Sequence, residues 1–248
     1  SAAETRGMVP LSGPYLITAA LCFVAVVVIF VFLRPEPMRT VRLEHEGVAV
    51  APGRPMRTVF ADPTVKLAVL ALGVSQLVMT MIMVITPLHM AHQSYSAQAV
   101  SWVIMAHTLG MFALSGVTGR MTERFGAPPV IAAGGIVLAI SAILAPFAHS
   151  LPMLMLALFL LGLGWNLGYV AGSALLSGAV ELSERGQAQG ISETLVAVAA
   201  AAGSFSIGPA FQRGGFVAVT MIGLALAMTL LAAQAATALR RNTPLSAD

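Results

Sequence analysis

Seven long apolar runs constrain the fold of this chain more than any other feature. They cover residues 15–33, 66–90, 99–117, 129–147, 152–176, 187–207 and 216–239. A helix needs roughly 20 apolar residues to cross about 30 Å of hydrocarbon, and each run approaches or exceeds that length. Only 9% of the residues are charged, too few to build a water-facing surface. The sequence therefore predicts an all-α protein that crosses a membrane seven times.

The basic residues predict how the chain is oriented. Of the 13 Lys and Arg residues, all except Arg6 and Arg213 fall at the run ends that share one side of the membrane. Basic residues in short loops stay on the cytoplasmic side. We therefore expect a multi-pass protein of the plasma or inner membrane, in contact with lipid, with Ser1 outside and Asp248 inside. The basic charge balance then needs no nucleic acid to explain it.

One long polar segment divides the chain. Residues 34–65 carry charges of both signs and several prolines, whereas the later connections are short. We expect an outer N-terminal segment with one transmembrane helix (1–33), a cytoplasmic linker (34–65), and a six-helix transmembrane domain with a short cytoplasmic tail (66–248). Six spans can form two inverted three-helix repeats, an arrangement known from transporters.

No pattern typical of an enzyme or of a cofactor site is present in the sequence. Cys22 is the single cysteine, and Lys66, the single lysine, lies at the edge of a run where it could not hold retinal. His89 and His92 have a spacing that would permit a shared metal, but they lack a third ligand. Glycine patterns of phosphate loops and a nucleophile elbow are missing from the sequence. We expect neither catalysis nor a bound cofactor or metal.

Polar side chains mark four of the seven runs. Gln76, His107, Asn166 and Glu193 each lie within a different run, whereas the other three runs carry at most one such residue near an end. Polar groups are costly in lipid and turn inward or toward a wet cavity. We expect the four marked helices to line a cavity and the other three to shield it from lipid.

The run 152–176 has two distinct faces. Gly164, Gly168 and Gly172 recur every four residues, a spacing that lets another helix approach closely, so we assign them to helix packing. A second face, roughly 200° round the helix, could contact a solute. It carries Asn166, Tyr169 and Ser173. For Asn166, a hydrogen bond between helices is an equally good interpretation.

The remaining polar positions support either a binding or a packing role. Gln76 and Thr80 share one face of their helix and could line the cavity. His107 titrates near neutral pH and could carry a coupling proton or contact a solute, or it could be a hydrogen-bonding strut. Glu193, about 9 Å along its helix, is a second candidate for the coupling proton. It could equally complement the positive helix start.

The stretch "GRMTERFGAPPV", residues 119–130, resembles the cytoplasmic loop signature of the major facilitator superfamily. That signature is a glycine, three residues, an acid, an arginine, any residue and a glycine, usually followed by two basic residues. The matching residues are Gly119, Glu123, Arg124 and Gly126. Glutamate replaces the preferred aspartate, and Ala127 and Pro128 replace the basic pair.

The resemblance covers nearly the whole chain. It implies that residues 15–33 are the family's sixth helix and residues 66–248 its seventh to twelfth, so that helices one to five would be missing partners. It also implies that the signature loop is part of a cytoplasmic gate and that Glu184 and Arg185 meet the latch loop of the absent half. In that fold the seventh, eighth, tenth and eleventh helices line the path, in agreement with the polar pattern.

The function implied by the resemblance is secondary active transport. We expect alternating access for a small amphipathic or apolar solute, with proton coupling and an efflux antiporter as the working hypothesis. The alternative is a membrane scaffold or a subunit of a larger complex that does not transport, because half a transporter contains only half a cavity.

Overall fold

The computed structural model describes the backbone of residues 12–32 and 53–242 and the side chains of residues 15–32 and 53–239. These two parts belong to separate compact units, divided after Pro52. The first contains α1 (Ser12–Phe32), whose 21 residues are long and apolar enough to cross a membrane. Residues 34–52 of the predicted linker lie outside the described residues.

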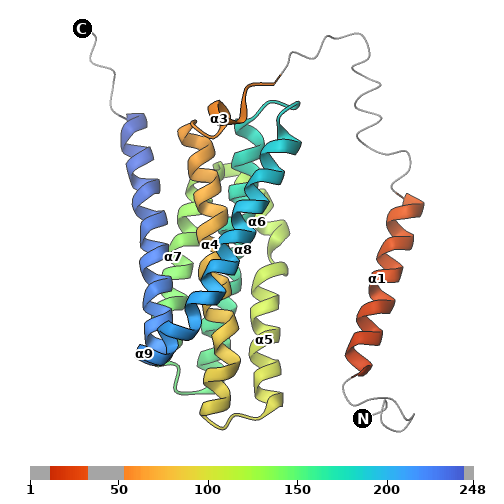
Figure 1. Cartoon of the computed structure of the whole chain (residues 1–248), viewed down its shortest axis with the longest axis vertical. Helices are drawn as coiled ribbons and strands as arrows, with labels where there is room; N and C mark the ends of the chain where they lie inside the picture. Colours follow the sequence, from red (N-terminus) through yellow and green to blue (C-terminus); the bar gives the residue numbers. More distant parts are fainter. Residues whose placement is uncertain (1–11, 33–52, 243–248) are drawn as a thin grey trace. The chain divides into compact units, whose positions relative to one another are not determined.

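The second unit is a bundle of long helices (Figure 1). Its elements are α3 (Met56–Val59), α4 (Pro63–His92), α5 (Ala97–Phe112), α6 (Ser115–Phe125), α7 (Ala127–Leu144), η2 (Ala145–Phe147), α8 (Leu151–Ala179) and α9 (Arg185–Asn242). The described residues contain six helical stretches that are long and apolar enough to cross a membrane, and one of them is α1. We call the end of the bundle that carries α3 the α3 end.

The last two apolar runs lie within a single kinked helix, α9. Its span of 55 residues is interrupted at Gly214 and Gly215, where Gly215 has φ 62° and ψ −155°. Glycine tolerates that region of backbone space, which other residues avoid. Figure 1 shows α9 turning back at the far end of the bundle, so that its last part returns to the α3 end. The two arms of α9 therefore correspond to the two predicted spans.

The start of α4 is set by a local cap. Asp62 accepts hydrogen bonds from the backbone N–H groups of Thr64 at 2.6 Å and Val65 at 3.4 Å, and Pro63 occupies the first helical position. These are the preferred residue types for a helix start. The Thr64 hydrogen bond is the main reason that the pKa of Asp62 lies below its usual value. The helix thus begins before the predicted start at residue 66.

Residues 53–62, predicted as the end of the linker, are part of the bundle. Val59 of α3 is fully buried in a cluster with Val65, Leu72 and Leu176. Because this side chain packs against α4 and α8, the compact unit begins at Gly53 rather than at residue 66. The boundary between linker and domain therefore lies earlier than the sequence indicated.

The predicted span 99–117 forms two helices in place of one. α5 ends at Phe112, and α6 begins at Ser115 and continues to Phe125. The predicted helix end just before Gly119 is therefore wrong. A methyl group on Gly119 would have no neighbour within 4 Å among the described residues, so this glycine marks no close contact with a described helix.

α8 is the central helix of the bundle and packs against α4, α5 and α7. Its glycines make this possible. A Cβ on Gly164 would meet Leu138 of α7 at 2.8 Å, and Gly168 faces the Ser75 hydroxyl of α4. A Cβ on Gly172 would lie 3.3 Å from the Ala68 carbonyl of α4. Small residues at these positions let the backbones approach, as in other membrane helix pairs.

Candidate functional site

Hydrogen bonds connect α4 to α8 inside the membrane-spanning region. The Trp165 indole Nε1 donates to the Gln76 side-chain oxygen at 2.9 Å. The Gln76 amide in turn donates to Thr80, one turn along α4, at 3.4 Å. The sequence predicts that Gln76 and Thr80 share one helix face, and the structure brings them together with Trp165.

Two aromatic rings continue from this contact along α8. The rings of Trp165 and Tyr169 stack with centroids 4.8 Å apart and an angle of 24° between their planes. Phe112 of α5 meets Trp165 edge-on at 6.2 Å. Offset stacked and edge-to-face pairs are the favoured geometries for aromatic rings. Trp165 and Tyr169 are four residues apart, so they lie on the same face of the helix.

The Tyr169 hydroxyl connects α8 to the first arm of α9. It donates to the Glu193 carboxylate, with distances of 3.0 Å and 2.8 Å to the two oxygens. Gln189, one turn before Glu193, donates to the same carboxylate at 2.9 Å. A carboxylate within a membrane span needs such partners, because an unsatisfied charge there is costly.

Together these residues form a continuous row that we call the polar–aromatic row. Each member is half-buried, so each keeps a surface that a solute could reach. Three spans contribute, and Glu193 adds a carboxylate to the row. The row consists of Thr80, Gln76, Trp165, Tyr169, Glu193 and Gln189. Ser173 lies one turn beyond Tyr169 on α8 and is also half-buried.

Asn166 lies in a packing contact on another side of α8. Its amide nitrogen donates to the Met111 carbonyl at 2.7 Å and to the Ser115 hydroxyl at 2.8 Å, and its oxygen accepts from Thr118 at 2.5 Å. The side chain is 1% exposed. These bonds join α8 to the break between α5 and α6. They favour the interhelical hydrogen bond over direct contact with a solute.

His107 is also held between α5 and α8. Its Nδ1 lies 3.0 Å from the Leu158 carbonyl, and the residue is 3% exposed. The backbones are very close here, since a methyl group on Gly162 would collide with the His107 carbonyl. His107 therefore has the contacts of a hydrogen-bonding strut between α5 and α8, one of the roles considered from the sequence. It is not a member of the polar–aromatic row.

The signature stretch forms the end of α6 and the turn into α7. Gly126 has φ 82°, the conformation that lets the chain reverse between the two helices. The Arg124 guanidinium carbon lies 5.4 Å from the centroid of the Phe125 ring. Glu123 is exposed and borders a shallow cavity of about 420 Å³ between α4, α6 and α8.

The turn before α9 is built around Glu184. Its carboxylate accepts from the Arg54 backbone N–H at 2.7 Å, from Nε at 3.0 Å and from Nη2 at 2.8 Å, and from the Glu181 N–H at 3.1 Å. The Arg54 side-chain hydrogen bond is the main cause that lowers the pKa of Glu184 to about 2, and the same bond raises the pKa of Arg54. Glu184 is 1% exposed, whereas Arg185, the first residue of α9, is exposed.

Sequence reasoning missed several partners in these contacts. Trp165 stands four residues before Tyr169, and this aromatic pair at helical spacing was the available signal. Gln189 stands four residues before Glu193 in the same way. By contrast, no local signal connects Arg54 to Glu184. The candidate metal pair also has other contacts: His89 stacks on Phe216 with centroids 4.2 Å apart.

The fold and the row define a class of protein. Long apolar helices with a half-buried polar row inside their spans are characteristic of multi-pass membrane proteins that handle solutes. The family described as Major Facilitator Superfamily matches residues 68–247. The chain therefore belongs to the major facilitator superfamily, a family of transporters and not of enzymes.

Three curated relatives are similar to the chain. The uncharacterised MFS-type transporters YdeG and YddS of Bacillus subtilis (strain 168) are 33% and 30% identical to the chain over 91% and 92% of its length. The riboflavin transporter RfnT of Brucella anthropi is 29% identical over 88% of the chain. The chain spans about half the length, 54%, of each of these curated relatives.

Proposed function

We propose that this chain provides the carboxy-terminal part of the solute path in a secondary transporter that works by alternating access. The polar–aromatic row carries this proposal. It connects α4, α8 and the first arm of α9 through Gln76, Trp165, Tyr169 and Glu193 at the depth of the spans. Polar groups at that depth are expensive unless they serve a cavity or a partner. The other wall of the path would come from the preceding helices of the family fold.

The chemistry of the row favours a small amphipathic solute with a planar ring. Trp165 and Tyr169 offer aromatic surface for stacking. Gln76 beside Trp165 and Glu193 beside Tyr169 offer hydrogen-bonding groups on either side of this aromatic surface. One relative is a riboflavin transporter by name, and riboflavin has this combination of a flat ring system and polar substituents. Riboflavin is therefore the first probe to use.

Glu193 is our candidate for the coupling proton. Its carboxylate is held by Tyr169 and Gln189 as an acceptor. Protonation would weaken both bonds and release the Tyr169 hydroxyl to turn toward a solute. His107, the other candidate from the sequence, is fixed by the Leu158 carbonyl in a packed contact, so we assign it a positioning role.

The distribution of charge supports a cytoplasmic α3 end in an inner or plasma membrane. Export, the working hypothesis from the family resemblance, is the first direction to test. Arg54, Lys66, Arg124 and Arg185 lie near the helix termini at this end, whereas Arg213 lies beside the kink of α9. In this orientation Gly119, Glu123, Arg124 and Gly126, together with Arg185, would meet the other half of the transporter as a gate.

The experiment is solute counterflow into liposomes by the protein in its full natural length. Trp165→Ala and Gln76→Ala should each reduce riboflavin counterflow at least tenfold, because each removes a predicted contact. Glu193→Gln should retain counterflow but lose its response to an imposed pH gradient. Thr194→Val, next to Glu193 on the exposed side, is the matched control and should behave as the natural protein.

The outcomes separate the possible interpretations. Counterflow that is insensitive to both Trp165→Ala and Gln76→Ala would overturn the assignment of the path. A gradient response that survives Glu193→Gln would overturn the coupling proposal alone. A thermal-shift panel of drugs, sugars and metabolites would identify further solutes to test by counterflow. If neither riboflavin nor any solute from this panel is transported, the scaffold alternative would be favoured.

A further inference from the structure

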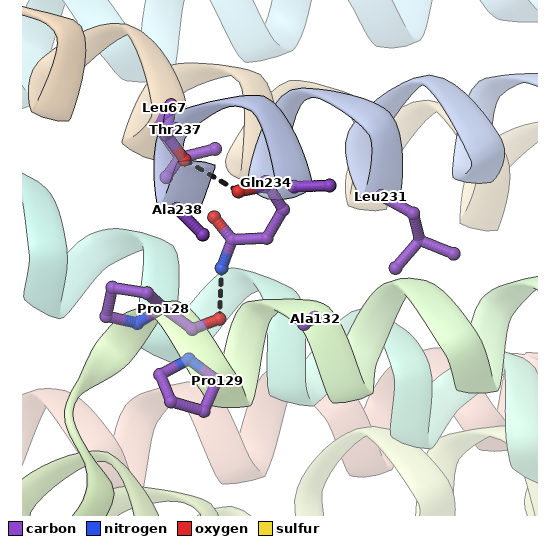
Figure 2. Close-up of a pocket in the computed structure, with 9 residues that line it drawn as sticks. Leu67, Pro128, Pro129, Ala132, Leu231, Gln234, Thr237 and Ala238 are labelled. Atoms are coloured by element: carbon purple, nitrogen blue, oxygen red, sulfur yellow. Dashed lines mark hydrogen bonds between the residues drawn. The ribbon is translucent and has the colours of Figure 1, made fainter. Parts of the chain in front are cut away.

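A groove opens between α7 and the last arm of α9 at the α3 end of the bundle (Figure 2). It has a volume of about 450 Å³. Figure 2 shows Pro128, Pro129 and Ala132 of α7 on one side and Leu231 and Gln234 of α9 on the other. This groove shares no residue with the polar–aromatic row, so a ligand bound in it would be independent of the proposed solute path.

Gln234 holds an unpartnered acceptor in the wall of the groove. Its Nε2 donates to the Pro128 carbonyl. Its Oε1 is buried and has no hydrogen-bond partner among the described residues, and the residue is 8% exposed. A donor in the groove therefore reaches this oxygen only when the amide group turns toward the groove. A buried carbonyl oxygen without a donor is costly, so a donor from outside the protein is expected at this site.

The described residues that line the groove supply no such donor. Pro128 and Pro129 have no backbone N–H, and the Thr237 hydroxyl donates to the Gln234 main-chain carbonyl at 2.8 Å. A buried water would need about two to four polar partners. Most of the lining is apolar, including Leu67 and Ala132, so one water would remain poorly bonded.

The polarity of the groove changes along the helix axes as it does in a phospholipid. Gln234 lies level with the first turn of α7, because it bonds the Pro128 carbonyl, and therefore lies near the membrane edge. One turn deeper, the lining is Ala132 and Leu231. Beyond that, a methyl group on Gly135 would come within 2.9 Å of Leu231, so the two helices meet and close the groove.

An apolar stripe on α7 continues from the groove toward the middle of the membrane. Ile136 and Ile140 follow Ala132 at four-residue intervals and are 50% and 47% exposed. Pro129 and Ala235 at the mouth of the groove are exposed as well. An acyl chain that leaves the groove would lie along this stripe, where it buries apolar surface.

We propose that the groove between α7 and α9 binds a membrane phospholipid whose headgroup donates a hydrogen bond to Gln234. An ammonium or a hydroxyl headgroup can supply the donor, and the charged ammonium forms the stronger bond. Small side chains such as Ala132 and Ala235 leave the space that the upper part of the acyl chain occupies.

Lipid retention measured by native mass spectrometry tests the proposal. The protein in its full natural length is loaded with phosphatidylethanolamine, phosphatidylglycerol or phosphatidylcholine with identical acyl chains. The first two carry N–H or O–H donors, whereas the trimethylammonium of phosphatidylcholine carries none. We expect about tenfold greater retention of a donor lipid than of phosphatidylcholine, the effect of one hydrogen bond to an otherwise unpaired group.

Three variants and one control locate the effect. Gln234→Leu keeps the side-chain bulk but removes the acceptor, so it should abolish the preference for donor lipids. Gln234→Glu keeps an acceptor and should keep the preference for phosphatidylethanolamine. Ala235→Phe fills the groove and should lower retention of all three lipids, whereas Ala236→Phe, exposed outside the groove, should leave retention unchanged.

Two results would overturn the proposal. One is equal retention of all three lipids by the natural protein, which would indicate that water or another protein segment satisfies Gln234. The other is an unchanged preference in a folded Gln234→Leu variant, with folding checked by circular dichroism. If Gln234→Leu fails to fold, equal effects of Ala235→Phe and Ala236→Phe on retention would reject the site.

Discussion

Arg54 and Glu184 stand 130 positions apart in the chain and form a two-pronged ion pair in which Nε and Nη2 donate to the two carboxylate oxygens. This pair ties the segment before α3 to the turn that precedes α9. The Glu184 carboxylate also accepts from two backbone N–H groups, so it organises the backbone on both sides of the contact. It is a fixed structural contact within this chain.

Replacing Glu184 by glutamine should lower the thermal midpoint of unfolding by several degrees. The amide cannot accept four hydrogen bonds as a carboxylate does, and it leaves Arg54 without its counter-ion. Glu181→Gln, three residues earlier on the exposed surface, is the control and should change the midpoint little. Equal effects of the two substitutions would contradict a specific role for the ion pair.

The contribution of Glu184 to stability should depend on pH. Its folded-state pKa of about 2 lies below the ordinary value of 4.5, so its stabilising contribution is complete above pH 4.5 and is lost as pH falls toward 2. The measurement is the difference in thermal midpoint between the natural protein and Glu184→Gln from pH 7 to pH 2.5. The difference should shrink below pH 4.5, and a constant difference would contradict the prediction.

Asn166→Ala should destabilise the protein without a specific effect on solute binding. Asn166 joins α8 to Met111, Ser115 and Thr118, and its loss leaves polar groups unpaired at a buried contact. Each such hydrogen bond in a membrane protein contributes about 0.6–2 kcal/mol, so we expect a loss of about 1–3 kcal/mol in unfolding free energy. A folded variant with normal stability but a higher dissociation constant for the solute would indicate that Asn166 contacts the solute.

Gly110→Ala should separate α5 from α8. A Cβ at this position would collide with the Phe159 carbonyl and lie 3.0 Å from the Leu163 backbone nitrogen, and neither backbone atom can move aside easily. Overpacking of this kind costs about 1–3 kcal/mol. Gly116→Ala is the matched control in α6, because its Cβ would have no neighbour within 4 Å in the part of the chain that the structure describes. Thermal unfolding that ranks the two variants in the opposite order would contradict the packing described for α8.

Gly215→Ala should destabilise the turn between the two arms of α9. With φ 62° and ψ −155°, Gly215 occupies a backbone region almost restricted to glycine, and an alanine there is strained by about 1–3 kcal/mol. Gly208→Ala, within the first arm, is the control and should be tolerated, because no described residue lies within 4 Å of its Cβ. A tolerated Gly215→Ala would indicate that the turn has a different backbone conformation in the membrane.

The spans could be predicted from the sequence because hydrophobic length is a local property. The run 129–147 corresponds closely to α7 and η2, and the run 152–176 to α8. The break between α5 and α6 could not be predicted in the same way. Neither Ala113 nor Leu114 is a helix breaker, and the break is stabilised by Asn166, which is 48 residues from Thr118. Tertiary contacts of this kind override local propensity.

The candidate site was predictable only in part, for a geometric reason. The sequence places Asn166 and Tyr169 on one helix face, yet three residues correspond to about 300° of rotation, which leaves their directions roughly 60° apart. That angle is enough to aim Asn166 at α6 and Tyr169 at α9. Trp165 and Tyr169, four residues apart, deviate by only about 40° and share a face. A shift of one position in the spacing therefore decides which neighbouring helix a side chain meets.

The interruption at Ala113 and Leu114 has a mechanical consequence. α5 and α6 are two stiff rods joined by a two-residue articulation, and the Met111 carbonyl beside it accepts from the Asn166 amide of a neighbouring helix. Tilting one rod against the other by rotation within those two residues leaves the main-chain ladder of each rod intact. What opposes such a bend is the set of hydrogen bonds that Asn166 makes to Met111, Ser115 and Thr118 on both sides of the articulation.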